Sequence, residues 1–410
     1  MHPRERRTTR RHFLFSSAGS IAALTGADTL LRAAGALAAS DGAPIGPGGI
    51  PLARRNFPVT LPIYSDNEPI ASGKNTEKGP LNVFNWSDYV NPATIKGFEK
   101  EYGVKVKITT FENEEEALAK LTSGQASFDV WFPTVEYLSR AVAGKLIQPV
   151  NHSYLPNLKN VWPSLQNPFY DVHSRYTVPY TVYTTGIAYR KDKLKQAPTG
   201  WDAFWKAKPY AGKVAILDDQ REALSMALLH RGITNINTED AKLVNAAGAD
   251  LRQLTKLVNV KTNVTDYTDV PTGAIWLAQG WSGDMAGAIN YMPKGVPVSV
   301  VGYWRPSKNA VIGSDMIAIL RGAKNPVLAH HFLNYLLDNK HGVQNFSWLG
   351  YMPPLSVINP DKVIAEGYIP KNLGSTVVRE SDFKAGLTIL PLTAQGQAEW
   401  QDAWATFKAG

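Results

Sequence analysis

The sequence predicts an α/β protein with two domains. From residue 81 to residue 143, short apolar runs typical of buried strands alternate with runs that have helix caps and helical length. Strands and helices that alternate at this spacing indicate βαβ units on a mostly parallel sheet. The chain has 410 residues, long enough to bury two hydrophobic cores. Its composition, 44% hydrophobic and 19% charged, is typical of a globular protein.

Caps and periodicity place the elements in order. In the first half we expect a strand from Leu81, a helix over 92–102 ending at Gly103, a strand over 104–111, a helix over 113–123 ending at Gly124, a strand over 128–132 and a helix from Pro133 to about 143. Residues 174–189 are rich in Thr, Tyr and Val and lack helix caps, which predicts extended chain crossing between the domains. In the second half we expect helices over 201–205, 223–230, 239–257, 273–280, 327–337 and 395–408, and strands over 214–217, 296–301 and 315–320.

The N-terminus has the pattern of an export signal. Residues 9–14, TRRHFL, resemble a twin-arginine signal, and an apolar run to Leu24 follows. Ala36-Leu37-Ala38 fits a small-residue cleavage site. An uncleaved anchor is the alternative, but the apolar run is too short to span a bilayer. We therefore expect a signal peptide over 1–38, a tether or N-terminal arm over 39–78, and a protein that is periplasmic, associated with the cell surface or secreted.

The charge and the lack of cysteine exclude several classes. Residues 1–38 hold six arginines against Glu5 and Asp28, a surplus of four, so the net charge of +8 leaves +4 for the rest. Those charges are scattered, which does not favour nucleic-acid binding. The sequence has no cysteine, which excludes disulfides, thiolate metal sites and cysteine nucleophiles. His330 and His331 are adjacent and cannot face the same side of a helix, so we expect no metal and no cofactor.

The stretch over residues 81–92 is the first candidate site. After the strand that begins at Leu81, the loop carries the aromatic rings of Trp86 and Tyr89 beside the carboxylate of Asp88. In open α/β sheets ligands bind just past the carboxyl ends of strands. Aromatic faces and a carboxylate together suit an organic cation. The alternative is that both rings are core residues and that the acid only caps the next helix.

The second half of the chain repeats this pairing of acids with aromatic rings at strand or turn ends. Asp219 and Glu222 begin a helix and form either a capping box or a pair of cleft acids. Trp281 and Asp284 flank a Ser-Gly turn. Asp315 begins an apolar strand, where an acid is costly unless it is paired or faces a ligand.

Two further features bear on this pattern. Tyr351 lies in a Gly-Tyr-Met-Pro-Pro turn and serves either packing or a cleft wall. Only Arg221 supplies a cation next to any of these acids. No G-x-S-x-G, H-E-x-x-H or P-loop motif is present in the sequence.

At residues 85–89, NWSDY, the sequence resembles the polyamine receptors of ABC transporters, the putrescine and spermidine periplasmic binding proteins. The resemblance runs from Leu81 to the C-terminus and includes five short motifs in the same order: NWSDY, DVWFPT over 129–134, DDQREA over 218–223, GWSGD over 280–284 and DMIA over 315–318. It implies a two-lobed type II periplasmic-binding-protein fold with crossover hinge strands and an interlobe cleft. By similarity, the first lobe is 79–182 plus 309–358 and the second is 183–308 plus 359–410.

The motifs carry over a ligand site. The resemblance implies that the ligand-binding residues are Trp86, Ser87, Asp88, Tyr89, Thr134, Asp219, Glu222, Trp281, Asp284, Asp315 and Tyr351. Gly313 stands where the family often has a bulky aromatic residue, which predicts a thinner wall, and Glu136 adds an acid. The pattern W-S-D-Y with W-x-x-D favours a diamine, whereas Asp219 and Glu136 suit a longer triamine.

The resemblance implies a monomeric receptor, not an enzyme, that binds a polyamine and delivers it to an ABC permease. Bound ligand would favour the closed state because the acids come from both lobes. One alternative is a receptor of the same fold for an opine or a basic amino acid, which needs a cationic partner for the ligand carboxylate. Another is an exported glycoside hydrolase, because paired carboxylates and aromatic platforms also build sugar sites.

Overall fold

The computed structural model describes residues 43–124 and 127–410. The predicted signal peptide, residues 1–38, lies outside the described residues.

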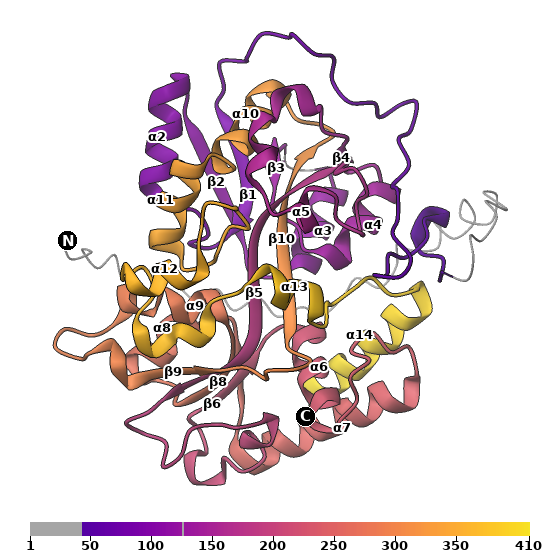
Figure 1. Ribbon diagram of the computed structural model, residues 1–410. Coiled ribbons are helices and arrows are strands. Elements are labelled where there is room, and N and C mark those ends of the chain that lie inside the picture. The colour runs from indigo at the N-terminus through magenta and orange to yellow at the C-terminus, as the bar shows by residue number, and fades with distance from the viewer. Residues whose placement is uncertain (1–42, 125–126) are drawn as a thin grey trace. The chain divides into compact units, whose positions relative to one another are not determined.

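The strands of the described chain form one mixed ten-stranded sheet with a main order of β2-β1-β3-β10-β5-β8-β6-β7 (Figure 1). The strands are β1 (Leu81–Trp86), β2 (Val106–Phe111), β3 (Val130–Trp131), β4 (Ile147–Gln148), β5 (Thr177–Arg190), β6 (Val214–Leu217), β7 (Lys261–Asn263), β8 (Leu277–Trp281), β9 (Val301–Trp304) and β10 (Val311–Leu320). Strands β1 to β3 pair in parallel, and so do β6 to β8. The antiparallel pair β5–β10 joins these two parallel groups.

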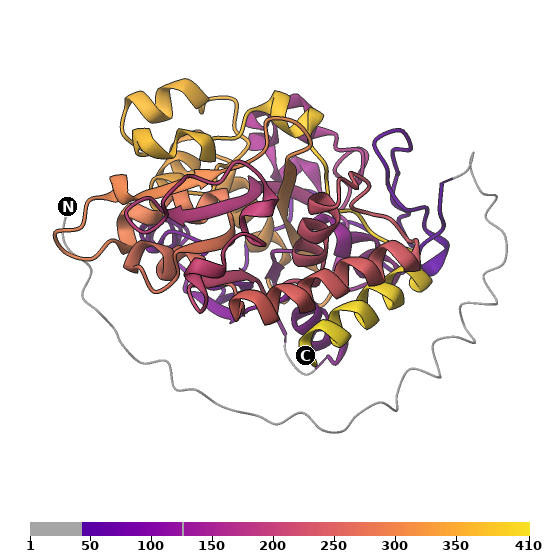
Figure 2. The ribbon, with the colours of Figure 1, turned by 90° about the horizontal axis from the view of Figure 1, so that it is seen from below.

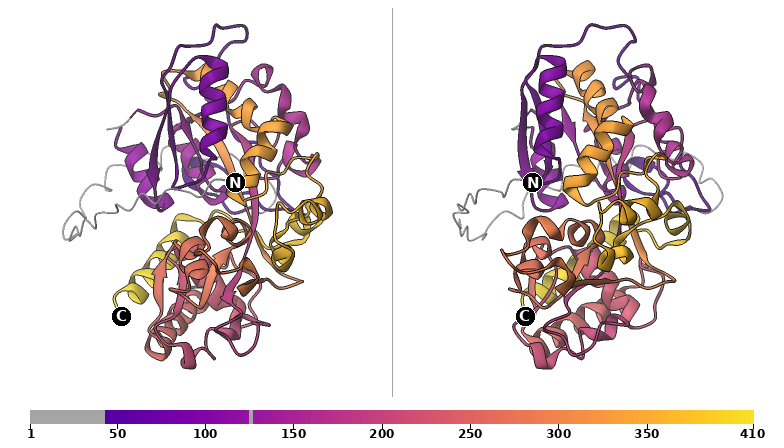
Figure 3. Two further views of the ribbon diagram at one scale, coloured as in Figure 1. Left: turned by 90° about the vertical axis from the view of Figure 1, so that its left-hand side faces the viewer. Right: turned by 60° about the vertical axis from the view of Figure 1, so that its left-hand side comes forward.

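Helices cover both groups of strands. They are α2 (Pro92–Tyr102), α3 (Glu114–Thr122), α4 (Val135–Ala143), α5 (Pro163–Gln166), α6 (Gln220–His230), α7 (Ala241–Val258), α8 (Asp266–Thr272), α9 (Ser282–Ala286), α10 (Pro326–Leu336), α11 (Asn339–Leu349), α12 (Pro360–Ala365), α13 (Glu380–Ala385) and α14 (Ala394–Lys408). Figure 3 shows α2 beside the orange helix α11 on the strands of the first group. Figure 2 shows α7 and α14 side by side on the second group.

Apolar packing extends over both groups of strands. Phe84, Phe98 and Phe332 belong to a large cluster of buried residues that continues past the central strands to Ala215 on β6 and Ala278 on β8. A separate cluster lies between β6, α6, α7 and α14 and contains Leu251 and Trp400. Helices packed on both parts of one sheet agree with the α/β class and the two-lobed organisation expected from the sequence.

The prediction of a helix over 273–280 is wrong. Gly273 has a left-handed backbone (φ 79°) that ends α8, and the chain continues as strand β8, which pairs with β5 and β6. A short apolar run fits a buried strand as well as a helix, and only tertiary pairing decides between them. The predicted strand over 296–301 is also displaced, because β9 begins at Val301.

Residues 43–78 form an arm bound to the folded body rather than a free tether. Leu52 and Leu61 are fully buried. The backbone N–H of Val59 donates to the carbonyl of Phe169 at 2.8 Å, and the hydroxyl of Tyr176 donates to the carbonyl of Pro62 at 2.6 Å. The Gly- and Pro-rich composition therefore predicts the lack of long regular elements, but not the packing.

Arg55 extends the contacts of this arm to a distant part of the chain. Its guanidinium lies 5.2 Å from the ring centroid of Phe169 and 5.3 Å from that of Phe383. One terminal nitrogen donates to the carbonyl of Phe383 at 2.5 Å and to the hydroxyl of Thr388 at 3.0 Å. The arm thus holds the segment that follows α13.

We expect Leu61→Ala to lower the free energy of unfolding by about 2–4 kcal/mol, because it removes a buried side chain and leaves a cavity. Urea unfolding followed by circular dichroism measures the change. Ile63, on the same arm but 43% exposed, is the matched control, and Ile63→Ala should change stability by less than about 0.5 kcal/mol. Equal effects of the two substitutions would contradict the bound arm.

Candidate functional site

The candidate site is a single cleft at the carboxyl ends of the parallel strands. All eleven residues predicted from the sequence line it: Trp86, Ser87, Asp88, Tyr89, Thr134, Asp219, Glu222, Trp281, Asp284, Asp315 and Tyr351. The loops that follow β1, β3, β6 and β8 bring most of them together, as the rule for open α/β sheets predicts. Glu136 and Gly313 also line the cleft.

The loop after β1 does not use its acid as a helix cap. The cap of α2 is Asn91, whose side-chain oxygen accepts from the N–H of Ala93 at 2.8 Å. Asp88 instead has a left-handed backbone (φ 54°) and lies exposed at the cleft. The hydroxyl of Ser87 donates to Glu112 at 3.4 Å.

The sequence left open whether Asp219 and Glu222 form a capping box or a pair of cleft acids, and the structure gives them different roles. Asp219 caps α6, because one carboxylate oxygen accepts from the N–H groups of Arg221 and Glu222 at 2.8 and 2.9 Å. Glu222 does not complete a capping box. Its carboxylate accepts from the hydroxyl of Thr185 and from the indole N–H of Trp281, both at 2.9 Å. Both acids line the cleft.

A chain of edge-to-face rings forms the aromatic wall. The Tyr89 and Tyr351 centroids are 5.0 Å apart at 83°, and those of Tyr351 and Tyr183 are 5.7 Å apart at 75°. The Tyr183 ring in turn lies 6.3 Å from Trp281 at 72°. Edge-to-face contacts of this kind stabilise ring orientation beyond simple area burial. Tyr183, on β5, was not predicted from the sequence.

The prediction of a thinner cleft wall at Gly313 is wrong, because the ring of Tyr183 fills the space beside this glycine. These two residues are partners in the β5–β10 pair, and a Cβ at position 313 would lie 2.2 Å from the Tyr183 ring. The glycine therefore makes room for an aromatic ring from the opposite strand. A Cβ at Gly283 would likewise lie 2.1 Å from a ring carbon of Tyr351. Glycine in a strand often marks such a close approach, which is the signal that could have identified Tyr183.

Asp315 is the buried acid on the crossover strands. A β-bulge interrupts the β10 register between Asp315 and Met316, and bulges of this kind re-aim side chains. The carboxylate accepts from the hydroxyl of Tyr89 at 2.5 Å and from that of Tyr183 at 3.2 Å. Burial raises the pKa of Asp315 to about 7, although both hydrogen bonds favour the ionised form.

Three further cleft acids, unlike the exposed Asp88, lie in the same kind of environment as Asp315. Burial, reinforced by nearby Asp219, raises the pKa of Glu222 to about 8 and that of Glu136 to about 7. Burial also raises the pKa of Asp284 to about 7. One carboxylate oxygen each of Glu114 and Glu222 is buried without a hydrogen-bond partner among the described residues. Carboxyl groups in this setting are stabilised by an incoming cation.

Arg221 does not supply that cation by direct contact. Its guanidinium donates to the carbonyl of Leu390 at 3.0 Å and to the side chain of Asn237 at 2.7 Å, and it lies 4.4 Å from the ring centroid of Trp400. Within the described part of the chain, no ion pair joins it to a cleft acid. It weakens the repulsion among the acids only from a distance.

Neither metal chemistry nor a membrane span is found within residues 43–124 and 127–410. These residues contain no group of three or more His, Cys, Asp or Glu side chains placed to hold a metal ion. The ring of His330 is a satisfied core group, with Nε2 accepting from the N–H of Asn151 at 2.9 Å and Nδ1 donating to the carbonyl of Pro326 at 2.7 Å. No helix among them is both long and apolar enough to cross a bilayer.

This two-lobed architecture with a cleft at the strand ends is that of an exported solute-binding protein. Residues 93–369 match the family of bacterial extracellular solute-binding proteins, and the chain belongs to that family. The family is one of solute-binding proteins.

Named relatives and solved structures agree with this assignment. The chain is 32% identical to the putrescine-binding periplasmic protein PotF of Escherichia coli, over 64% of this chain and 74% of the relative. It is 30% identical to the spermidine/putrescine-binding periplasmic protein of the same organism, over 68% and 78%. A solved Listeria monocytogenes protein, assigned to a spermidine/putrescine ABC transporter, superposes with a TM-score of 0.70 at 25% identity, covering 80% of this chain and 98% of that protein.

The raised carboxyl pKa values predict how pH affects the ligand-free protein. Between the ordinary value of 4.5 and about 8, the folded state holds more protons at Glu222 than the unfolded chain does. Its contribution to the free energy of unfolding therefore falls as the pH rises through that window. As the pH is raised over this range, we expect the thermal unfolding temperature of Glu222→Gln to fall less than that of the wild type. Glu366→Gln, at an exposed position, should show the same pH dependence as the wild type. If the unfolding temperatures of Glu222→Gln and the wild type fell equally with pH, the raised pKa of Glu222 would be contradicted.

Proposed function

We propose that this protein is an extracytoplasmic receptor that binds a polyamine, putrescine or spermidine, and delivers it to an ABC permease. The observation that carries the proposal is the cleft itself, in which buried carboxyl groups face aromatic rings and no described cation pairs with them. A protonated amine that leaves water needs such charge partners. The names of the two Escherichia coli relatives support the same ligand class.

The proposed roles follow from the contacts in the cleft. The aliphatic chain of the ligand lies against Trp86, Tyr89, Trp281 and Tyr351, and its ammonium groups lie against Asp88, Asp219, Glu222, Asp284 and Asp315. Ser87 and Thr134 supply hydroxyl or main-chain contacts. This distribution places acids at separate points along an aromatic slot, so that they select the spacing between nitrogens.

The proposed lobes are residues 79–182 plus 309–358 and residues 183–308 plus 359–410. Acids from both lobes then contact one ligand, so bound ligand stabilises the closed state, and the paired strands β5 and β10 absorb the rotation. We further propose that the protein acts as a monomer, that a twin-arginine-type signal exports it, and that it works in the periplasm, at the cell surface or as a secreted protein.

The two alternatives have less support. An opine or a basic amino acid carries a carboxylate, and Arg221, the cation beside the cleft acids, already donates to Leu390 and Asn237. A glycoside hydrolase needs an acid/base pair flanking a sugar, whereas these acids lie in separate loops, and the chain belongs to a family of binding proteins.

Calorimetric titration of the chain without residues 1–38 tests the ligand class, with putrescine, cadaverine, spermidine and spermine as ligands and arginine as the comparison. We expect at least one polyamine to bind with micromolar or tighter affinity. Asp315→Asn should weaken that binding by about tenfold or more, because it removes a charge partner of the amine.

Glu366→Gln serves as the matched control, since it removes an exposed carboxylate that does not line the cleft, and it should bind like the wild type. Binding of arginine but of no polyamine would keep the family and overturn the ligand. The absence of any binding, together with hydrolysis of a chromogenic glycoside, would overturn the receptor function.

A further inference from the structure

Asp266 is a buried acid that lies behind the cleft rather than in its lining. It stands in the first turn of α8 and is 2% exposed. Gly280 on β8 leaves the space it occupies, because a Cβ there would lie 2.2 Å from Asp266 Oδ2. Apart from the backbone N–H of Asp266 itself, its carboxyl oxygens have no N–H or O–H donor among the described residues. Its side-chain partner is the carboxyl of Asp284.

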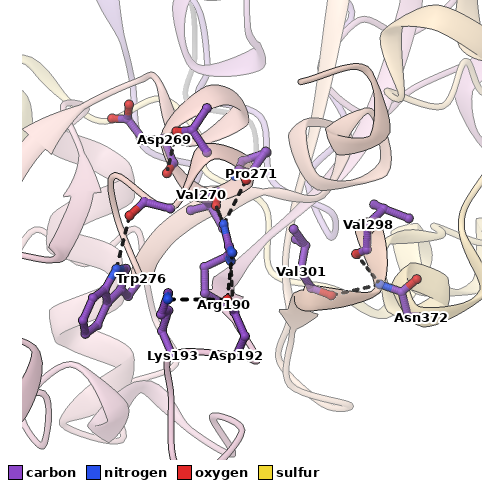
Figure 4. Close-up of polar contacts among 12 residues, drawn as sticks. Arg190, Asp192, Lys193, Asp269, Val270, Pro271, Trp276, Val298, Val301 and Asn372 are labelled. Carbon is purple, nitrogen blue, oxygen red and sulfur yellow. Dashed lines mark hydrogen bonds and ion pairs between the residues drawn. The ribbon is translucent and has the colours of Figure 1, made fainter. Parts of the chain in front are cut away.

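The position of Asp266 is fixed through the other end of its helix. The Arg190 guanidinium donates to the carbonyls of Pro271 at 2.9 Å and Val270 at 3.4 Å (Figure 4). The same group is held by Asp192, whose oxygens accept at 2.8 and 2.9 Å. A Cβ at Gly273 would lie 2.9 Å from Arg190, so the helix end packs closely on it. These contacts hold α8 and with it the backbone position of Asp266.

Two carboxyl groups in this arrangement share a proton. Ionised carboxylates only accept hydrogen bonds, so the Asp266–Asp284 bond exists only when one of them is protonated. Asp266 is the more enclosed of the two, whereas Asp284 lines the cleft and has a further hydrogen bond with Tyr351. Because Asp266 is 2% exposed while Asp284 is only partly buried, the shared proton favours Asp266. Burial and the adjacent Asp284 raise the pKa of Asp266 in the same direction.

We propose that Asp266 acts as a neutral hydrogen-bond donor that orients Asp284 and keeps it ionised toward the ligand's ammonium group. Asp266 is then a positioning residue, since it contacts Asp284 and not the ligand. The inference rests on the proposed function for its ligand, but the state of the Asp266 carboxyl does not depend on any ligand.

No described cation offers an alternative partner for the pair. The groups that act on Asp266 and Asp284 are Asp269 on the same helix, Tyr303 on β9 and Tyr351 after α11. Arg190 binds at the far end of α8 and is paired with Asp192. The groups around the pair are thus acids and phenols. Among the described residues, no cationic side chain lies between the two carboxyls, and a shared proton is what relieves their repulsion.

The test compares a neutral donor with no donor at position 266. Asp266→Asn keeps an N–H donor of the same size, so its polyamine Kd should stay within about threefold of the wild type. Asp266→Ala removes the donor, so the Kd should rise by about tenfold or more, and the pH at which affinity is half-maximal should shift upward as the ionised form of Asp284 loses support. A purely structural role would not move that pH midpoint.

Asp402→Asn is the matched control, because Asp402 is an exposed acid on α14 that does not line the cleft; it should leave both the Kd and the midpoint unchanged. If Asp266→Asn binds as weakly as Asp266→Ala, position 266 needs a charge and the proposal is wrong. Wild-type affinity of Asp266→Ala would overturn it equally.

Carboxyl-carbon NMR of the ligand-free protein separates this inference from the proposed function. At neutral pH, the Asp266 resonance should lie at the protonated position and the signal should be absent in Asp266→Asn. An ionised Asp266 would overturn the inference even if polyamines bind. If no polyamine binds to the wild type, the proposed function fails, while this spectrum still decides the state of Asp266.

Discussion

The burial of carboxyl groups without cationic partners is the constraint on which the rest of the cleft depends. Taking an ionised acid out of water costs several kcal/mol, roughly, unless charge or hydrogen bonds replace the water. The protein meets part of that cost with phenol and indole donors, as at Asp315 and Glu222. The rest of the desolvation cost is not offset, because buried oxygens on Glu114 and Glu222 have no described partner. Such a cleft strongly favours a positively charged ligand.

The β5–β10 pair makes this chemistry possible because it places residues from the two strand groups against each other. Tyr183 and Asp315 both lie on these strands, and their side chains meet in a hydrogen bond. The same two strands are the longest in the described sheet and connect its parallel parts. The elements proposed to bend when the lobes close are therefore also elements that carry a charge partner and a wall of the site.

The sequence predicted the loops of the site better than its strands. Aromatic and acidic residues in Gly- or Ser-containing turns, such as Trp86 and Asp284, stand out because such turns have little core to fill. Tyr183 did not stand out, since a tyrosine in a Thr- and Val-rich strand is an ordinary packing residue until its partner is known to be Gly313. Asp266 was missed for a similar reason: its meaning depends on a facing acid that lies eighteen positions away in the sequence.

Regular elements were predicted wherever local signals were strong. Helix α2 spans residues 92–102 and ends at Gly103 as expected, whereas the run over 273–280 carried no local feature that separates strand from helix. The arm over 43–78 shows most plainly that local sequence does not predict tertiary packing. Nothing within it indicates the burial of Leu61, because the large cluster that contains this residue is built mostly from parts of the chain far away in sequence.

The contact between Arg55 and Phe383 has a consequence for how the chain folds. The two residues are 328 positions apart, and Asp66 on the same arm contacts Arg321, 255 positions away. Closing such long loops costs chain entropy before any contact repays it. The arm is the first part of the described chain to be synthesised, yet it can complete its contacts only after nearly all the rest exists. Its docking therefore comes late in folding, and it joins the first described residues to the segment that completes the cleft wall at Thr388.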